Sequence, residues 1–368
     1  MTRTTTSPPH RGHAEARRKR RRAALDLNRV RPRNIAVVTA ATLIALGLNA
    51  EVAVADPAPT SRASDTIGYG PELRDEAAAF AYGLAFPDAA PQGANDWSCK
   101  PDDAHPRPVV LVHGTWANAY GAYASMSPQL KQAGYCVFTF NFGRPVVRGQ
   151  GLDALLPGAT GDIEESTKQV ATFVDRVLAA TGASQVDMIG HSQAALETRL
   201  YLKYEGGANP DDPARNKVKH LITYGGTNHG TSLDSFATLM LAIQAKLPPG
   251  SIDLHVPFTQ ALGAGGIQQV YDSKVVAKVN EGGDTVPGVD YTIVGGIYDE
   301  VSTPFDKTFL TAGPGATVND IVLQDGCPQD ISDHNSMLYS PRAISIALNA
   351  LDPVAHPDLV CSVNPWLI

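Results

Sequence analysis

The fold is decided by the stretch Val186-Asp187-Met188-Ile189-Gly190-His191-Ser192-Gln193-Ala194-Ala195-Leu196, an apolar run that stops at a serine and continues into a helix-forming segment. This pattern predicts a strand, a sharp turn at Ser192 and a helix. A serine on such a turn has a strained backbone and a projecting hydroxyl, so the residues two before and two after it must be small. Gly190 and Ala194 meet that demand, although the usual pattern is G-x-S-x-G and Ala194 adds one methyl group. We therefore predict that Ser192 is a nucleophile rather than a structural serine.

Further apolar runs of strand length lie on both sides of this stretch, at residues 108–112, 135–140, 219–224 and 291–297. Helix-forming segments separate them. One is opened by Asp162, which forms a capping box with Glu165, and is stopped by Gly182; a closing helix over residues 341–351 begins at Pro341. Alternating strands and helices predict an α/β fold, with a mostly parallel sheet, helices on both faces and functional loops at the carboxyl ends of the strands.

The first 55 residues have the organisation of a secretory signal peptide. A basic segment from Arg17 to Arg33 precedes an apolar run from Ile35 to Leu48, and Ala53-Val54-Ala55 supplies a small-x-small cleavage site. A nucleic-acid-binding arm followed by a short core helix would not explain why the apolar run ends in this site and then in Pro-rich sequence. We expect the mature protein to be secreted and extracellular, by the general or the twin-arginine route.

The remaining chain is acidic and sized for one enzyme domain. The full chain has 368 residues, and without residues 1–55, which carry 11 Lys/Arg and 3 Asp/Glu, the net charge is −15. Such a charge repels nucleic acid and anionic membranes, and no second apolar run is long enough to span a bilayer. We expect an irregular lead-in over residues 56–106 and a catalytic domain over residues 107–368.

Four cysteines remain after cleavage, an even number in a chain bound for an oxidising compartment. Two disulfides are therefore predicted. Of three possible connectivities, sequence order favours Cys99 with Cys136 and Cys327 with Cys361. No C-x-x-C motif or His/Cys cluster occurs, so we expect no zinc site.

An apolar, interrupted stretch follows the strand at 219–224 and runs from about residue 231 to residue 265. It could form a cap over the functional face that lines an acyl pocket, or an ordinary buried helix. The residues favour neither interpretation.

A serine nucleophile needs an imidazole to take its proton and a carboxylate to orient that imidazole. Asp299 directly follows a late strand, the expected place for the acid, and Glu300 is its nearest rival. For the base we predict His334, on a polar loop before the closing helix. The alternatives are weaker: His229 and His356 lack comparable positions, and His113, His191 and His220 are expected to be structural.

An acyl-transfer site also needs donors for the negative charge that develops on the carbonyl oxygen. The backbone N–H of Gln193 lies at the start of the helix after the serine, where the helix dipole adds to its effect. The turn His113-Gly114-Thr115 follows the buried strand at 108–112 and supplies the backbone N–H of Thr115, with the Thr115 hydroxyl as an additional candidate donor.

The chain resembles secreted lipases of the α/β-hydrolase superfamily, notably the actinobacterial class 2 lipases and the fungal lipase B of Candida antarctica. The resemblance rests on Val112-His113-Gly114-Thr115, Gly190-His191-Ser192-Gln193, Tyr298-Asp299-Glu300 with Pro304, and Asp333-His334, and runs from about Cys99 to Cys361. It implies a catalytic triad of Ser192, Asp299 and His334, an oxyanion hole at Thr115 and Gln193, and neither a metal nor a cofactor.

The leading hypothesis is a secreted carboxylester hydrolase that cleaves acyl esters, with acylglycerols as the expected class, through an acyl-enzyme. A polyester hydrolase or an acyltransferase would use the same residues. A non-catalytic binding protein on the same scaffold would need a broken triad, and all three members are present.

Overall fold

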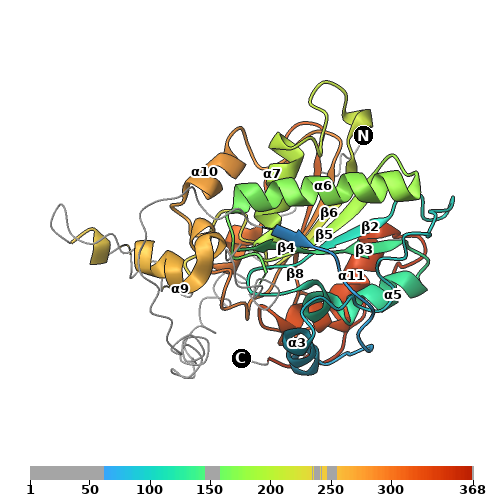
Figure 1. Cartoon of the computed structure of the whole chain (residues 1–368), viewed down its shortest axis with the longest axis horizontal. Coiled ribbons are helices and arrows are strands. Elements are labelled where there is room, and N and C mark those ends of the chain that lie inside the picture. The colour runs from blue at the N-terminus through green and yellow to red at the C-terminus, as the bar shows by residue number, and fades with distance from the viewer. Residues whose placement is uncertain are drawn as a thin grey trace, which may run out of the picture. The chain divides into compact units, whose positions relative to one another are not determined.

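A six-stranded sheet forms the centre of the computed structural model, which describes residues 62–145 and 158–366 apart from 234, 236–240, 242 and 247–254 (Figure 1). All neighbouring strands in this sheet are parallel, in the order β3-β2-β5-β6-β7-β8. The strands are β2 Val109–Val112, β3 Val137–Thr139, β5 Val186–His191, β6 Val218–Tyr224, β7 Asp290–Gly295 and β8 Thr317–Val322. The described residues belong to one compact unit, Ala53–Ile368.

The central strands are mostly apolar because both faces of the sheet are buried there. In β2, Val109 and Leu111 pack into one hydrophobic cluster, whereas Val110 and Val112 pack into another on the opposite face. Successive side chains of a strand point to opposite faces, so an unbroken apolar run fits a strand covered on both sides.

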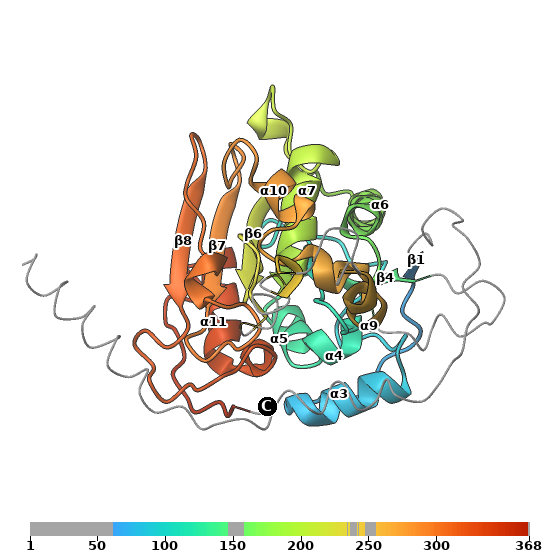
Figure 2. The ribbon, with the colours of Figure 1, turned by 90° about the vertical axis from the view of Figure 1, so that its left-hand side faces the viewer.

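Helices cover both faces of the sheet (Figures 1 and 2). One layer consists of α6 Ile163–Thr181, α7 Ala194–Tyr204 and α10 Lys274–Asn280; the other contains α3 Glu76–Ala85, α4 Ala119–Tyr123, α5 Met126–Gln132 and α11 Pro341–Leu351. Short 3-10 turns lie at Pro213–Arg215, Phe305–Thr308 and Ser336–Tyr339. The predicted α/β-hydrolase architecture is confirmed.

Helix α6 begins and ends where its capping residues predict. The side chain of Asp162 accepts a hydrogen bond from the N–H of Glu165 at 3.0 Å, and Gly182 closes the helix at a φ of 81°. The carboxylate of Glu165 accepts from Lys168 rather than from the cap. A helix N-cap of this kind stabilises by about 1 kcal/mol.

The segment before the sheet is more ordered than the sequence predicts. Strand β1 Arg62–Ser64 pairs antiparallel with β4 Asn141–Arg144, and α3 lies against α4. The lead-in expected to be irregular over residues 56–106 thus contains, in its described part, the strand β1 and the helix α3. Helix α3 buries only Ala79 and Gly83, so its sequence carries no pattern of large apolar residues.

The described part of the 231–265 stretch includes the start of α9 His255–Gln268, which is kinked at Gly263. The predicted signal peptide, residues 1–55, lies outside the described residues, as does much of the stretch before α9. Within the described chain, no helix has the length and apolar character needed to span a membrane.

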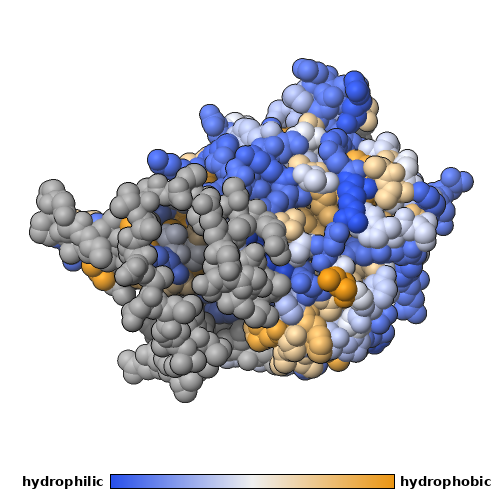
Figure 3. All heavy atoms as spheres, viewed as in Figure 1, coloured by the Kyte–Doolittle hydropathy of each residue, from blue (hydrophilic) through white to orange (hydrophobic). Residues whose placement is uncertain are grey.

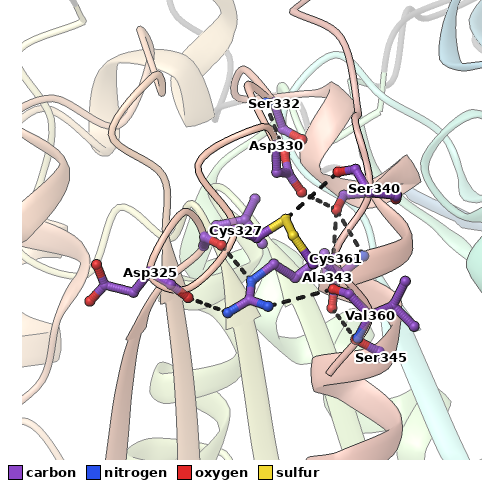
Figure 4. Close-up of a disulfide and its surroundings, with 12 residues drawn as sticks. Asp325, Cys327, Asp330, Ser332, Ser340, Ala343, Ser345, Val360 and Cys361 are labelled. Carbon is purple, nitrogen blue, oxygen red and sulfur yellow. Dashed lines mark hydrogen bonds between the residues drawn. A yellow bond between two sulfur atoms is a disulfide. The ribbon is translucent and has the colours of Figure 1, made fainter. Parts of the chain in front are cut away.

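Both disulfides favoured by sequence order are present, Cys99–Cys136 and Cys327–Cys361. The second ties the C-terminal segment to the loop that leads to α11 (Figure 4). In that loop the carboxylate of Asp330 accepts hydrogen bonds from Ser332 and Ser340. The loop that carries His334 is therefore anchored both covalently and by buried hydrogen bonds.

Large apolar side chains are exposed on and around α3. Phe80 and Leu84 lie on the helix, and Phe86 directly follows it. Figure 3 shows hydrophobic atoms gathered at the edge of the molecule where α3 lies in Figure 1. Side chains exposed in this way do not contribute to the core.

Candidate active site

Ser192 occupies the turn between β5 and α7 in a strained conformation. Its φ is 57°, in the left-handed region that residues with a Cβ rarely adopt. The N–H of Ser192 donates to the carbonyl of Tyr224 at 2.9 Å, which fixes the turn to the end of β6. A Cβ on Gly114 would lie 2.9 Å from the Cβ of Ser192, so the loop after β2 approaches the serine closely only because it carries glycine.

The close packing around the turn accounts for Gly190 and accommodates Ala194. Ala194 is fully buried, and a Cβ on Gly190 would lie 3.3 Å from the Cβ of Ala194. The extra methyl group of Ala194 therefore fits because residue 190 has none. The departure from G-x-S-x-G leaves the turn intact.

His334 and Asp299 form a buried pair. The Nδ1 of His334 lies 2.9 Å from Oδ2 and 3.0 Å from Oδ1 of Asp299, and the two residues are 4% and 6% exposed. Because the carboxylate accepts at Nδ1, the neutral imidazole carries its proton there and leaves Nε2 as an acceptor.

Backbone groups hold Asp299 in place after β7. Its Oδ1 accepts hydrogen bonds from the N–H groups of Val301 at 2.9 Å and Ser302 at 2.7 Å. A Cβ on Gly225 would lie 2.8 Å from Asp299 Oδ2 and 3.1 Å from His334 Nδ1, so this glycine lets β6 approach the pair. The carboxylate is thereby oriented toward the imidazole before any substrate binds.

The loop of His334 is fixed beside the serine. The Nε2 of His191, the neighbour of Ser192, lies 2.8 Å from the carbonyl oxygen of His334, and the two rings are 4.6 Å apart. Asp333 accepts from the N–H of Ser336 at 2.7 Å and closes the loop on itself. Residues from β5, β7 and the loop before α11 thus meet at one edge of the sheet.

Charged neighbours control the titration of His334. Burial alone would lower its pKa, but the charge and hydrogen bond of Asp299, together with the charges of Glu300 and Asp333, raise its pKa above the ordinary value. Burial raises the pKa of Glu300 to about 7, and Oε2 of Glu300 accepts from the N–H of His334 at 3.2 Å. Glu300 therefore supports the histidine loop, while Asp299 contacts the imidazole.

The alternative histidines have other partners. Burial lowers the pKa of His113 to about 4 and that of His191 well below its ordinary value, so both are neutral near pH 7. His229 contacts the carbonyl of Lys307 and the carboxylate of Asp284. His220, on β6, lies near Asp187 and Asp290, and His356 follows α11. None of these contacts places them beside Asp299.

Two backbone donors are available next to Ser192. Within the described part of the chain, neither the N–H of Gln193 nor that of Thr115 donates a hydrogen bond. Gln193 is the next residue after Ser192 in the chain, and Thr115 is the next residue after Gly114, which packs against the serine. Unpaired N–H groups at such a place fit an oxygen that gains negative charge.

The side chains of these two residues belong to a network that sequence reasoning missed. Thr115 Oγ1 donates to Gln193 Oε1 at 2.6 Å and accepts from Gln269 Nε2 at 3.0 Å, and Gln193 Nε2 donates to Glu197 Oε1 at 2.7 Å. Gln269 follows α9 and has no motif that would mark it. For Glu197 the sequence offers one indication: it lies one turn after Gln193 in the same helical segment, so the two side chains share a face.

The arrangement contains the parts needed for nucleophilic acyl transfer. Among the described residues, neither the Ser192 hydroxyl nor Nε2 of His334 has a hydrogen-bond partner. Catalytic hydrogen bonds are often long or unformed in enzymes without substrate. No group of three or more His, Cys, Asp or Glu within the described ranges is arranged to hold a metal ion. The chemistry available is that of a serine, an oriented imidazole and free N–H groups.

The sequence and the structure of this chain are similar to those of known lipases. The model of the family described as Lipase (class 2) matches residues 106–311. Lipase B of Aspergillus fumigatus has a similar structure, with a TM-score of 0.50, 20% identity and coverage of 71% of this chain and 55% of that one. A lipase of Bacillus licheniformis matches with a TM-score of 0.44 and 15% identity, covering 68% and 94% of the two chains. The chain thus spans little more than half of the Aspergillus lipase, and the likeness to it shows the fold.

Proposed function

The chain belongs to the class 2 lipase family, and from this premise we propose that it is a secreted serine carboxylester hydrolase that cleaves acyl esters, acylglycerols in particular, through an acyl-enzyme. The observation that carries the proposal is the buried His334–Asp299 pair beside Ser192 on its strained turn. A structural serine would not require a φ of 57° next to an oriented imidazole.

Each residue has a defined role in the proposed mechanism. His334 Nε2 takes the proton of the Ser192 hydroxyl as its oxygen attacks the ester carbonyl, and Asp299 stabilises the imidazolium that results. The N–H groups of Gln193 and Thr115 bind the oxyanion of the tetrahedral intermediate. His334 then donates the proton to the departing alcohol, which leaves the acyl group on Ser192.

The second half of the cycle uses the same groups. Water replaces the alcohol, gives its proton to His334 and attacks the acyl carbonyl, and the oxyanion binds again at Gln193 and Thr115. Collapse of this intermediate releases the carboxylic acid and returns the proton to Ser192.

The surroundings of the site support an apolar acyl substrate. Trp116, next to Thr115, is 40% exposed, and Ile297 and Tyr298, directly before Asp299, are 49% and 42% exposed. The indole N–H of Trp116 donates to the carbonyl of Leu262 on α9, so this helix approaches the oxyanion loop as a cap would. Exposed apolar side chains gathered near polar catalytic groups are typical of a binding site for an apolar ligand.

Export is supported by the basic, apolar and small-residue order of residues 1–55 and by the two disulfides. We propose that the mature protein begins after Ala55. Mass spectrometry of protein from the culture medium would give the start of the chain.

The test is a panel of p-nitrophenyl esters of rising chain length, hydrolysed by the wild type and by Ser192→Ala. The wild type should hydrolyse the esters, and Ser192→Ala should lose nearly all activity because no other group can form the acyl-enzyme. Ser166→Ala, which changes a buried serine on α6, is the matched control and should keep wild-type turnover. Substantial hydrolysis by pure Ser192→Ala would end this proposal.

A further inference from the structure

Glu197 is a carboxyl group buried beside the site without an assigned role. It lies on α7 and is fully buried. Its Oε1 accepts from Gln193 Nε2 at 2.7 Å, while its Oε2 has no hydrogen-bond partner among the described residues. A buried carboxylate with an unpaired oxygen is costly, so the group resists ionisation. Burial raises the pKa of Glu197 to about 8.

The amide of Gln193 connects this carboxyl to the Thr115 hydroxyl. Gln193 is fully buried and places its Nε2 on Glu197 and its Oε1 2.6 Å from Thr115 Oγ1. A Cβ on Gly265 of α9 would lie 2.8 Å from Oε1 and 2.9 Å from Nε2 of Gln193, so the backbone of α9 packs directly against this amide. Among the described residues, the hydrogen-bond partners of the Gln193 amide are Thr115 at its oxygen and Glu197 at its nitrogen.

The structure shows one of two orientations that satisfy the network. In this orientation the Thr115 hydroxyl donates its proton to Gln193 Oε1 and cannot donate to an oxyanion. With the amide turned by half a rotation, Nε2 of Gln193 would donate to Thr115 Oγ1 and its Oε1 would face Glu197. Gln269 already donates to the same hydroxyl oxygen, so both lone pairs would be occupied and the Thr115 proton would point to the substrate.

The second orientation depends on a proton at Glu197. Gln193 Oε1 can only accept, so Glu197 must present an O–H group toward it. A carboxylate there would face the amide oxygen with no donor between them and would hold the amide in the first orientation. The other charged group that affects Glu197 is Asp162, at the N-terminus of α6, and its charge also opposes ionisation.

We infer that Glu197 is a positioning residue of the oxyanion hole, which decides through the Gln193 amide whether the Thr115 hydroxyl donates to Gln193 or to the oxyanion. This inference rests on the proposed function. Protonated Glu197 permits the donor orientation, and ionised Glu197 withdraws one donor from the transition state. Activity should accordingly fall as pH rises through the pKa of Glu197.

The experiment measures kcat and KM against pH, on a soluble short-chain p-nitrophenyl ester, for four proteins. In the wild type, kcat should fall above pH 8 toward a value about 10²-fold lower, as expected for loss of one oxyanion donor, with little change in KM. Glu197→Gln can present either an N–H or an oxygen to Gln193 at every pH, so its kcat should stay level on the alkaline side. Thr115→Val should be slower at pH 7 by about 10²-fold and should also lack the alkaline fall, because no hydroxyl remains to be redirected.

Thr198→Val is the matched control, since Thr198 is buried next to Glu197 but bonds to the carbonyl of Ala194. It should keep the wild-type pH profile.

The inference would be overturned if kcat of Glu197→Gln fell at high pH as in the wild type, or if kcat of the wild type did not fall. A fall of kcat at high pH that persists in Thr115→Val would exclude the hydroxyl route. Failure of the proposed function looks different: ester hydrolysis would be absent from the wild type or would survive in Ser192→Ala. Thermal unfolding of each variant shows that the comparison is between folded proteins.

Discussion

At the scale of single residues, three carboxylates lie around His334, and each accepts hydrogen bonds from a different group. Asp299 contacts the imidazole, Glu300 accepts from the backbone N–H of His334, and Asp333 closes the loop. Their charges raise the pKa of His334 against the effect of burial. Since the proposed base must be neutral to accept a proton, activity should be lost as pH falls through this raised pKa.

Two substitutions separate these roles. Asp299→Asn should lower kcat by up to about 10⁴-fold, because the amide favours the wrong tautomer of His334. Glu300→Gln should retain most of kcat, since its side-chain oxygen still accepts from the His334 N–H. It should move the acid limb of the kcat profile toward lower pH by up to about one unit, because a nearby negative charge is removed and the pKa of His334 falls. Loss of turnover in Glu300→Gln with an active Asp299→Asn would reverse the assignment of the acid.

How far the sequence predicts the site depends on the kind of residue. Ser192, Asp299 and His334 follow from a turn motif and from loop positions, and the structure brings them to one edge of the sheet. Glu197 and Gln269 carry no motif, because their contacts with Gln193 and Thr115 arise only when α7 and α9 pack against the oxyanion loop. The part of the site that depends on packing between distant segments is the part that the sequence does not predict.

At the scale of elements, the buried strands β2, β5, β6 and β7 were predicted because both of their faces are apolar. Strand β8 was not predicted, because it lies at the edge of the sheet. Its residues Asn319 and Asp320 are polar and exposed, so they interrupt the apolar pattern. Helix α3 was missed because small residues form its buried face. Elements whose stability comes from pairing or close approach leave little trace in hydrophobic pattern.

The cap of α11 offers a test of how an element supports the site. Ser340 Oγ accepts from the N–H groups of Arg342 and Ala343 and donates to Asp330 in the histidine loop. Ser340→Ala should lower the free energy of unfolding by about 1–2 kcal/mol, measured by urea denaturation, and should also lower kcat because Asp330 loses a partner.

Ser273→Ala removes the comparable cap of α10, where Ser273 accepts from the N–H of Val276. It should cost a similar free energy and leave kcat unchanged. Equal kcat for the two variants would show that the Asp330 contact does not support the histidine loop.

At the scale of the whole molecule, the two disulfides close loops of similar size but hold different parts of the chain. Their sequence separations are 37 residues for Cys99–Cys136 and 34 for Cys327–Cys361. Beyond the second disulfide, Asn364 donates to Ser332 Oγ and to the carbonyl of Ser336, on both sides of His334. The C-terminal segment therefore supports the histidine loop, whereas the first disulfide supports β3.

Replacing each pair by serine should destabilise the protein by about 3–4 kcal/mol in the chain-entropy model, since the loops are alike. Only Cys327→Ser with Cys361→Ser should also lower kcat at a temperature where both proteins are folded. Equal kcat values for the two double variants would mean that the C-terminal segment does not position His334.

The central claim is that Ser192 is the nucleophile of an acyl-transfer site, and the most direct measurement is covalent labelling. A p-nitrophenyl alkylphosphonate should release one equivalent of p-nitrophenolate per chain and leave a single adduct, which peptide mass spectrometry should locate on Ser192. Asp299→Asn should react far more slowly, and Ser192→Ala should not react. An adduct on another residue, or labelling of Ser192→Ala at the wild-type rate, would contradict the claim.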